Sequence, residues 1–397
     1  MKKNLLFVMP SLSSGGGERS LVNLLNQIDF DQYNVDLQLL NVEGLFMELV
    51  PKQVRIVPVA GTFHLFKLGL GLSVQRYLRS GNLSLAYYRF MFSLENRRAK
   101  NASIGEQLSW KYMSKSMEKL KKHYDAAIGF LEKTSIYYCI EKVDADKKIG
   151  WIHTDYDKLG MDPIHDINYF EKLDYIVTVS EECANTLERN FPDQSHKINI
   201  IHNIVSPTTI RSMAEEQEHD VYDRTGDELI ILSVGRLTPE KGFDLAVEAC
   251  RDLLNRGYHV KWNIIGEGEE REKLTKLIEE NGLTQHFKLL GLKNNPYSYI
   301  KQADIFVQTS KFEGKSIAID EAKILNKPIV VTRFNTAKDQ INDGVDGLIV
   351  DMNAAAVASG IEALIQDKGL ANQIVEHLSR QKLGTEEEIK KLYQLLA

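Results

Sequence analysis

Residues 229–254 read LIILSVGRLTPEKGFDLAVEACRDLL, in which a short apolar run leads through a glycine turn into a helical pattern. Residues 229–234 are apolar except for one serine, which is typical of a parallel strand covered on both faces. Apolar side chains then recur at helical spacing from Phe243 to Leu254, which predicts a helix with one buried face. A strand, a tight turn and a helix in this order predict α/β architecture with a parallel sheet.

The same alternation of strands and helices continues in both directions along the chain. In the first half we expect seven strands, at residues 4–9, 34–40, 54–57, 125–130, 148–152, 173–179 and 198–201. In the second half we expect six, at residues 229–234, 259–265, 287–290, 304–308, 328–332 and 347–350. The 397 residues are therefore expected to form two Rossmann-like, doubly wound parallel-sheet domains that face a central cleft.

The boundary between the domains is expected near Pro207. Residues 203–228 contain this proline and a polar run, which favours a linker or a surface loop. We assign residues 1–205 to an N-terminal domain and residues 206–380 to a C-terminal domain. Residues 381–397 are expected to form a last helix that could pack on either domain, including back on the first.

The formal net charge of −6, from 49 basic and 55 acidic residues, argues against a nucleic-acid-binding protein. It conceals an asymmetry, because residues 61–123 contain 12 Lys and Arg, only 3 Asp and Glu, and many aromatic residues. This segment could bind an anionic membrane or an acceptor, or it could be a solvated helical face whose rings belong to the core. The cations that would form the patch are Arg89, Arg97, Arg98, Lys119 and Lys122.

Three dispersed cysteines and the lack of a long apolar run favour a cytoplasmic protein, which would associate peripherally with the inner face of the membrane through that patch. We expect no leader peptide, because the apolar stretch after Met1 is short and ends in a glycine loop. Two Asp-x-Asp sequences, at residues 144–146 and 155–157, are the candidates for a metal site. So short a pattern arises readily by chance, and we expect no metal.

Two loops contain residues suited to phosphate. Gly15, Gly16 and Gly17 follow the first expected strand and precede a helix, where backbone amides can approach an anion; a merely tight turn is the alternative. Arg236 and Lys241 lie five residues apart at the end of a buried strand, where two cations suit a diphosphate. Surface cations on an ordinary loop are the alternative there.

Residues 312–322, FEGKSIAIDEA, place two carboxylates around the start of a helix. Glu313 lies on the loop before the helix and could accept sugar hydroxyls, while Glu321 within the helix could accept both hydroxyls of a ribose. The amides near Ser316 and Ile317 could bind phosphate or sugar oxygens. For each Glu taken alone, a solvated helix or loop face is the better interpretation.

These motifs in order, with Lys327-Pro328-Ile329-Val330 and Gly344 to Gly347 after them, resemble glycosyltransferase family 4 over most of residues 229–351. The glycine loop and Trp151-Ile152-His153 match that family's first domain more loosely. One departure is that Lys315 and Ser316 follow Glu-Gly where the family commonly has an apolar or aromatic residue and then Gly or Pro. Lys315 puts the identity of the donor sugar in question more than the reaction type.

The resemblance implies the GT-B fold and a retaining hexosyltransferase-type transfer (EC 2.4) from a nucleotide sugar, most simply a UDP-sugar, without a metal or other cofactor. It implies that Arg236 and Lys241 hold the diphosphate, Glu313 the donor sugar, and His153 a sugar hydroxyl near the reacting carbon. The remaining donor contacts that it implies are at Gly16, Gly17, Gly266, Leu292, Ser316, Ile317 and Glu321.

The expected acceptor is a polyprenyl-diphosphate-linked or polymeric glycan of capsule, exopolysaccharide or a similar envelope polymer. Two other functions stay open at this point. A nucleotide-sugar epimerase of the same fold would act without any acceptor. A non-catalytic partner subunit would be favoured by the loss of Arg236, Lys241 or Glu313, and all three are present.

Overall fold

The computed structural model describes residues 2–13, 15–216, 220–222, 224 and 226–397. The chain divides into two compact units. Unit 1 comprises residues 1–13, 24–202 and 388–397, and unit 2 comprises residues 14–23 and 203–387. Within the described part of the chain, no helix is both long and apolar enough to cross a bilayer.

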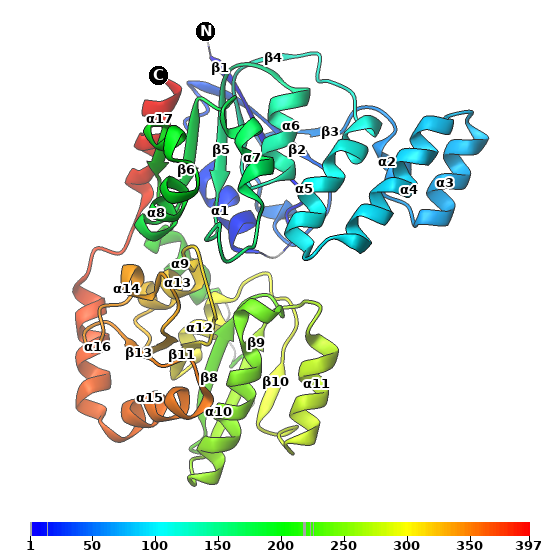
Figure 1. The fold of residues 1–397 in the computed structure, drawn as a ribbon. Helices are drawn as coiled ribbons and strands as arrows, with labels where there is room; N and C mark the ends of the chain where they lie inside the picture. Colours follow the sequence, from blue (N-terminus) through cyan, green and yellow to red (C-terminus); the bar gives the residue numbers. More distant parts are fainter. Residues whose placement is uncertain (1, 14, 217–219, 223, 225) are drawn as a thin grey trace. The chain divides into compact units, whose positions relative to one another are not determined.

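Unit 1 is built on a seven-stranded parallel sheet (Figure 1). Its strands are β1 (Lys3–Met9), β2 (Tyr33–Leu39), β3 (Arg55–Pro58), β4 (His123–Gly129), β5 (Asp144–Ile152), β6 (Tyr175–Thr178) and β7 (Ile198–Ile200). Their order is β3-β2-β1-β4-β5-β6-β7, so the winding direction reverses between β1 and β4. The seven strands expected from the apolar runs are confirmed, with ends shifted by a few residues.

Helices cover both faces of this sheet. Those of unit 1 are α2 (Phe63–Phe66), α3 (Leu70–Arg79), α4 (Leu83–Arg98), α5 (Ala102–Met113), α6 (Thr134–Lys142), α7 (Pro163–Phe170), α8 (Glu181–Asn190) and α17 (Ile389–Leu396). Helix α17 packs on unit 1, where the ring of Tyr393 stacks on Tyr33 at 5.3 Å and its hydroxyl accepts the N–H of Asp29 at 2.8 Å. Helix α1 (Gly16–Leu25) follows β1 and has most of its residues in the part of the chain grouped with unit 2.

Helices α2 to α5 form an insertion between β3 and β4, drawn in blue to cyan in Figure 1. Helices α3 and α4 pack as an antiparallel hairpin that lies farthest from the sheet of unit 1. The basic, aromatic segment 61–123 is this insertion together with the first residue of β4. Some of its aromatic rings are core, among them the fully buried Tyr77 and Trp110.

Unit 2 has a six-stranded parallel sheet in the order β10-β9-β8-β11-β12-β13. Its strands are β8 (Leu229–Val234), β9 (Val260–Ile265), β10 (Phe287–Leu289), β11 (Ile305–Gln308), β12 (Ile329–Thr332) and β13 (Leu348–Val350). All six were expected from the sequence. The reversal of strand order between β8 and β11 is a point where ligands bind in such sheets.

Two apolar clusters cover the two faces of this second sheet. The helices of unit 2 are α9 (Pro207–Glu215), α10 (Phe243–Asn255), α11 (Arg271–Glu280), α12 (Tyr297–Gln302), α13 (Ile317–Ile324), α14 (Ala337–Gln340), α15 (Ala354–Gln366) and α16 (Lys368–Arg380). Helices α10, α11, α15 and α16 cover one face, and α9, α12, α13 and α14 the other. The helix expected from Phe243 onward is confirmed as α10, with Ala246, Val247 and Cys250 fully buried.

The linker expected at residues 203–228 is wrong in part. Residues 207–215 form helix α9, which begins at Pro207 and buries Ile210 and Ala214 in the core of unit 2. A proline suits the first turn of a helix as well as it suits a loop. The polar composition of the segment favoured the loop interpretation and hid the helix. Residues 217–219, 223 and 225 of this segment lie outside the described residues.

Candidate functional site

A tight turn after β8 brings Lys241 to the carboxyl end of β11. Residues 239–241 form one turn of 3-10 helix, and Gly242 then adopts a left-handed conformation with φ of 61°. A Cβ atom at Gly242 would lie 2.2 Å from the carbonyl oxygen of Thr309. Only glycine fits there, because a side chain would be strained in φ and would collide with the backbone of the next strand. The hydroxyl of Thr309 donates in turn to the carbonyl of Lys241 at 3.0 Å.

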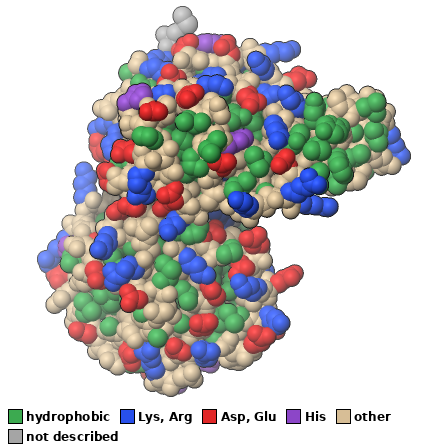
Figure 2. Space-filling view, in the orientation of Figure 1, with side chains coloured by type: hydrophobic (Ala, Val, Ile, Leu, Met, Phe, Trp, Pro, Cys, Tyr) green, Lys and Arg blue, Asp and Glu red, His purple; other side chains and the backbone are tan. Residues whose placement is uncertain are grey.

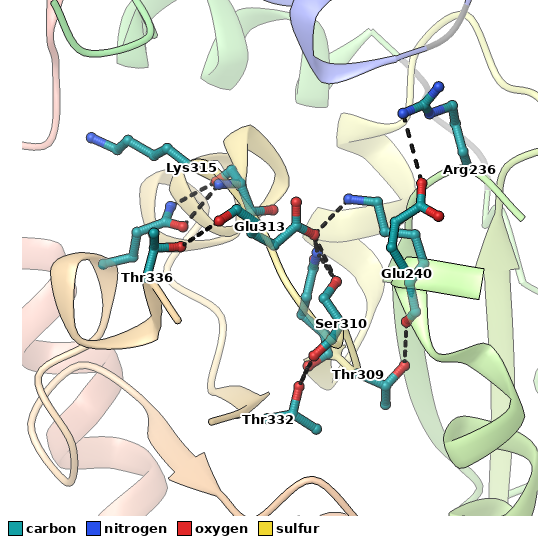
Figure 3. A network of polar contacts seen from close by, with 12 residues as sticks. Arg236, Glu240, Thr309, Ser310, Glu313, Lys315, Thr332 and Thr336 are labelled. Atoms are coloured by element: carbon teal, nitrogen blue, oxygen red, sulfur yellow. Dashed lines mark hydrogen bonds and ion pairs between the residues drawn. The ribbon is translucent and has the colours of Figure 1, made fainter. Parts of the chain in front are cut away.

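The Lys241 ammonium forms an ion pair with Glu313, with 2.5 Å between Nζ and Oε1 (Figure 3). The two side chains are only 16% and 11% exposed. The same Oε1 accepts a hydrogen bond from Ser310 Oγ at 2.6 Å and one from Gln308 Nε2 at 2.7 Å. Three donors thus converge on one carboxylate oxygen, which fixes the orientation of Glu313 and leaves Oε2 outside this network.

The loop that carries Glu313 is held by side chains from beyond β12. The N–H of Glu313 donates to Asn335 Oδ1 at 3.1 Å, and the hydroxyl of Thr336 donates to the carbonyl of Glu313 at 3.2 Å. Gln340 binds both backbone groups of Ser316, with 2.8 Å to its N–H and 2.8 Å to its carbonyl. These supporting residues were not predicted, because amides and hydroxyls scattered over thirty residues give no pattern that sequence reasoning can find.

Arg236 lies on the same turn and reaches outward. Its side chain is 53% exposed, and its Nη2 lies 3.8 Å from Glu240 Oε1 (Figure 3). The loop after β9 packs closely on it: a Cβ at Gly266 would lie 1.8 Å from the carbonyl oxygen of Gly235. Leu292, on the loop after β10, is 41% exposed. An exposed guanidinium and a partly buried ammonium beside the same strand ends form a cationic site suited to a diphosphate.

Glu321 lies within α13 and is 2% exposed. Its Oε1 accepts a hydrogen bond from the hydroxyl of Tyr297 at 3.0 Å and lies 3.4 Å from Nη1 of Arg19, within unit 2. Burial raises the pKa of Glu321 above its ordinary value, and the charge of Arg19 opposes this. A ribose that binds Glu321 would have to share or replace these partners.

Further predicted donor contacts lie at the starts of two helices, in parts of the chain grouped with unit 2. Ile317 is the first residue of α13, and Gly16 and Gly17 form the first turn of α1 rather than a loop before it. A Cβ at Gly16 would meet open space, so its glycine is not required by packing. The ammonium Nζ of Lys315 lies 4.0 Å from Oδ2 of Asp320.

His153 follows β5 in unit 1 and is 9% exposed. Burial lowers the pKa of its imidazole to about 3, so the ring is neutral near pH 7. Its Nε2 is buried and has no hydrogen-bond partner within the described part of the chain. The structure therefore brings Arg236, Lys241, Glu313 and Glu321 together in unit 2, and places His153 in the other unit.

The predicted cationic patch is wrong at Arg89. Arg89 is 8% exposed, because its guanidinium donates to the carbonyls of Phe66 and Leu68 and lies over the ring of Phe92. It is a structural residue of the insertion. Lys122 is bound to Asp36 at 3.1 Å, beside the amino end of β4. Arg97, Arg98 and Lys119 are exposed as expected.

In the described part of the chain, no group of three or more His, Cys, Asp or Glu side chains is arranged to hold a metal ion. Asp144 and Asp146 flank His123, at 3.1 and 3.2 Å from its ring nitrogens. Asp157 accepts a hydrogen bond from Asn190 at 2.7 Å, and Asp155 accepts the N–H of Lys158 at 3.1 Å.

Comparison with known proteins finds similarity in the second half of the chain. Residues 214–380 match the family model described as glycosyl transferases group 1. A Campylobacter jejuni N-acetylgalactosamine-N,N'-diacetylbacillosaminyl-diphospho-undecaprenol 4-alpha-N-acetylgalactosaminyltransferase is 30% identical over 51% of this chain and 53% of its own length. The chain spans about half the length of the curated relatives that it matches.

Solved structures resemble the chain over its full length. Anabaena HepE in complex with UDP-glucose aligns with a TM-score of 0.68 over 99% of both chains, at 15% identity. A mutant of S. aureus TarM in complex with Fondaparinux, alpha-GlcNAc-glycerol and UDP aligns with a TM-score of 0.67 over 99% of both chains, at 17% identity. The chain has the two-sheet GT-B fold of these proteins, and its residues 214–380 match the family model of group 1 glycosyl transferases.

Proposed function

We propose that this protein is a retaining glycosyltransferase that moves a sugar from a nucleotide-diphosphate sugar, UDP-linked in the simplest case, to a glycan acceptor. The observation that carries the proposal is the Lys241–Glu313 pair, 2.5 Å apart where β8 and β11 end. It puts a cation for the diphosphate next to a carboxylate for sugar hydroxyls, which is the chemistry a sugar diphosphate needs.

Charge is the main requirement of the reaction. When the bond between the sugar and the diphosphate breaks, negative charge grows on the leaving phosphate, and Arg236 and Lys241 stabilise it. Both cations are present before the substrate arrives, so little reorganisation is needed during the reaction. Lys241 already carries its counter-ion, and donor binding therefore draws the ammonium from Glu313 toward phosphate and frees Glu313 Oε1 for the sugar.

Retention of configuration fits a front-face transfer, in which the leaving phosphate takes the proton of the acceptor hydroxyl. No protein base is required by this route. His153 suits a site without a base, because its lowered pKa keeps the ring neutral and able to bind a hydroxyl. Positioning of the acceptor hydroxyl next to the reacting carbon then provides much of the rate enhancement over the uncatalysed transfer.

The proposed acceptor is a polyprenyl-diphosphate-linked or polymeric saccharide of an envelope polysaccharide. The Campylobacter jejuni relative, whose name specifies a diphospho-undecaprenol acceptor, supports a lipid-linked acceptor. Such an acceptor is held in a membrane, so the enzyme would work at the cytoplasmic face of the bilayer.

The hairpin α3–α4 provides a surface for that membrane. Leu83, Tyr87 and Phe90 lie on one face of α4 at helical spacing and are 69%, 56% and 51% exposed. Figure 2 shows hydrophobic side chains gathered over this hairpin, with cations at its border. Arg97 continues the same face of α4. Apolar rings beside cations favour the interface of an anionic bilayer.

The donor proposal is tested by thermal unfolding with uridine, guanosine, adenosine and thymidine diphosphates and their sugars. A true donor at 100 times its dissociation constant stabilises the folded state by about 2.7 kcal/mol. No shift with any of them would refute the donor site. With the donor identified, proton NMR of the product shows whether the anomeric configuration is retained.

Single-residue variants then test which side chains the transfer reaction requires. Lys241→Ala and Glu313→Ala should remove transfer while the proteins stay folded, and Lys276→Ala, on an exposed face of α11, should leave it unchanged. Full activity in Lys241→Ala would contradict its role.

The membrane proposal is tested by sedimentation with vesicles that contain phosphatidylglycerol. Tyr87→Glu with Phe90→Glu, and separately Arg97→Glu with Arg98→Glu, should release the protein from the vesicles. Lys276→Glu is the matched surface control. Unchanged sedimentation of both double variants would show that the hairpin is a solvated face.

A further inference from the structure

The turn between β4 and α6 contains a backbone conformation that its residue disfavours. Lys133 has φ of 64° and ψ of −115°. Among the described residues, the other non-glycine residue with positive φ is Asn326, at 53°. Asparagine tolerates such a conformation, whereas lysine pays a strain that glycine would avoid. Such a conformation persists only where the surrounding structure holds the residue in place.

The strained turn is locked against its surroundings. A Cβ at Gly129, the last residue of β4, would lie 2.7 Å from Cα of Ile136, so α6 packs tightly on the strand. Lys133 Nζ forms an ion pair with Glu106 Oε2 on α5 at 2.8 Å. The other oxygen of Glu106 accepts the hydroxyl of Thr134 at 2.7 Å. The conformation is therefore fixed on both sides of Lys133.

The turn presents Glu132 beside His153. Glu132 is 7% exposed, and its Oε2 accepts the backbone N–H of His153 at 3.2 Å. The buried Nε2 of His153 has no hydrogen-bond partner among the residues that the structure describes, which leaves it a polar group for a ligand to satisfy. Both residues follow neighbouring parallel strands, β4 and β5, at the edge where ligands bind in such sheets.

We propose that Glu132 binds a hydroxyl of the acceptor sugar, and that Lys133 is the positioning residue that holds Glu132 at the strand edge. The proposal rests on the glycosyl transfer proposed above and adds an acceptor-binding residue in unit 1. Glu132 is a carboxyl group on a rigid turn, which suits the orientation of a neutral hydroxyl.

The local charge favours a hydroxyl over a phosphate. Glu106 and Glu132 provide two carboxyl groups against the single ammonium of Lys133. The start of α6, which would otherwise attract an anion, already donates the hydroxyl of Thr134 to Glu106. A phosphate of a lipid carrier would therefore be repelled here, so this turn would contact the sugar end of a lipid-linked acceptor.

The test compares two activities of the same enzyme. Donor hydrolysis is the release of UDP from a UDP-sugar with water alone, and transfer is the additional release with an octyl glycoside of glucose, galactose or N-acetylglucosamine. Glu132→Gln keeps the shape but loses the charge, and should raise the KM for the octyl glycoside about tenfold or more. Donor hydrolysis and the dissociation constant for the UDP-sugar should not change.

Lys133→Gly separates function from folding. Glycine adopts the conformation of Lys133 without strain, and this gain offsets the loss of the Lys133–Glu106 ion pair, so the melting temperature should change little. The KM for the octyl glycoside should nevertheless rise. A turn with only a structural role would leave that KM unchanged. Glu118→Gln, an exposed glutamate of unit 1, is the control that should change neither activity.

The outcomes distinguish this inference from the proposed function. Unchanged acceptor KM in both variants, or a weaker UDP-sugar affinity in Glu132→Gln, would overturn the acceptor role of Glu132. Wild-type protein that neither binds a nucleotide sugar nor transfers one would refute the proposed function, and this inference with it.

Discussion

The ion pair between Lys241 and Glu313 offers the sharpest test of the described site. The two charges are 2.5 Å apart, and both side chains are largely removed from water. At an effective dielectric constant of about 20, their gross attraction is about 7 kcal/mol. Desolvation of both groups offsets most of it, so a net coupling of about 1–3 kcal/mol is expected.

A double-mutant cycle measures this coupling. Glu313→Gln leaves a largely buried ammonium without its carboxylate and should destabilise unit 2 by about 3 kcal/mol. Lys241→Met leaves Glu313 with the donors Ser310 and Gln308, and should lower the free energy of unfolding of unit 2 by about 1–3 kcal/mol. The double variant should lose less unfolding free energy than the two single variants lose together, and the difference is the coupling energy.

The assay is urea unfolding followed by hydrogen exchange of peptides from unit 2, which report that unit separately from unit 1. The exposed pair Lys276 and Glu280 on α11, 3.6 Å apart, is the matched control and should couple by less than about 0.5 kcal/mol. A coupling between Lys241 and Glu313 as small as that of the control would refute the reasoning.

Two further predictions concern glycine and histidine. Gly242→Ala should destabilise unit 2 by about 2 kcal/mol or more in thermal unfolding, because it adds a collision with Thr309 to the strain of positive φ. Gly257→Ala is the control, since Gly257 has φ of 88° but no described atom within 4 Å of the added Cβ, and it should cost only about 1 kcal/mol of stability. Equal losses of stability in the two variants would contradict the close approach of Gly242 to Thr309. The pKa of His153 is about 3 in the folded protein, below the ordinary value of 6.5, so from about pH 6.5 down to pH 3 the unfolded chain binds one more proton. Unit 1 should therefore lose about 2 kcal/mol between pH 7 and pH 5 through this group, and urea titrations of His153→Gln should lack this part of the pH dependence.

The sequence was sufficient to predict the sheets, because buried parallel strands are continuous apolar runs. It also indicated the residues that meet at the strand ends of unit 2, since Arg236, Lys241 and Glu313 each follow such a run within a few residues. Carboxyl ends of parallel strands share one edge, so proximity in the fold follows from order along the chain.

Contacts that depend on the path of a helix could not be predicted. Arg89 looked like part of a cationic surface, but the packing of α4 on α2 buries its guanidinium against the carbonyls of Phe66 and Leu68. Glu132 and Lys133 were overlooked for a similar reason. Nothing in their composition indicates a strained turn, and φ of 64° at Lys133 is visible only in the structure.

The central claim is that the cationic strand ends of unit 2 bind the diphosphate of a nucleotide sugar. Isothermal titration calorimetry with UDP tests it most directly, with the wild-type protein, Lys241→Met and the surface control Lys276→Met. We predict that the wild type binds UDP, that Lys241→Met weakens binding about tenfold or more, and that Lys276→Met binds as the wild type does. Equal UDP affinity in the wild type and Lys241→Met, or no binding of UDP or any other nucleoside diphosphate to the wild type, would contradict it.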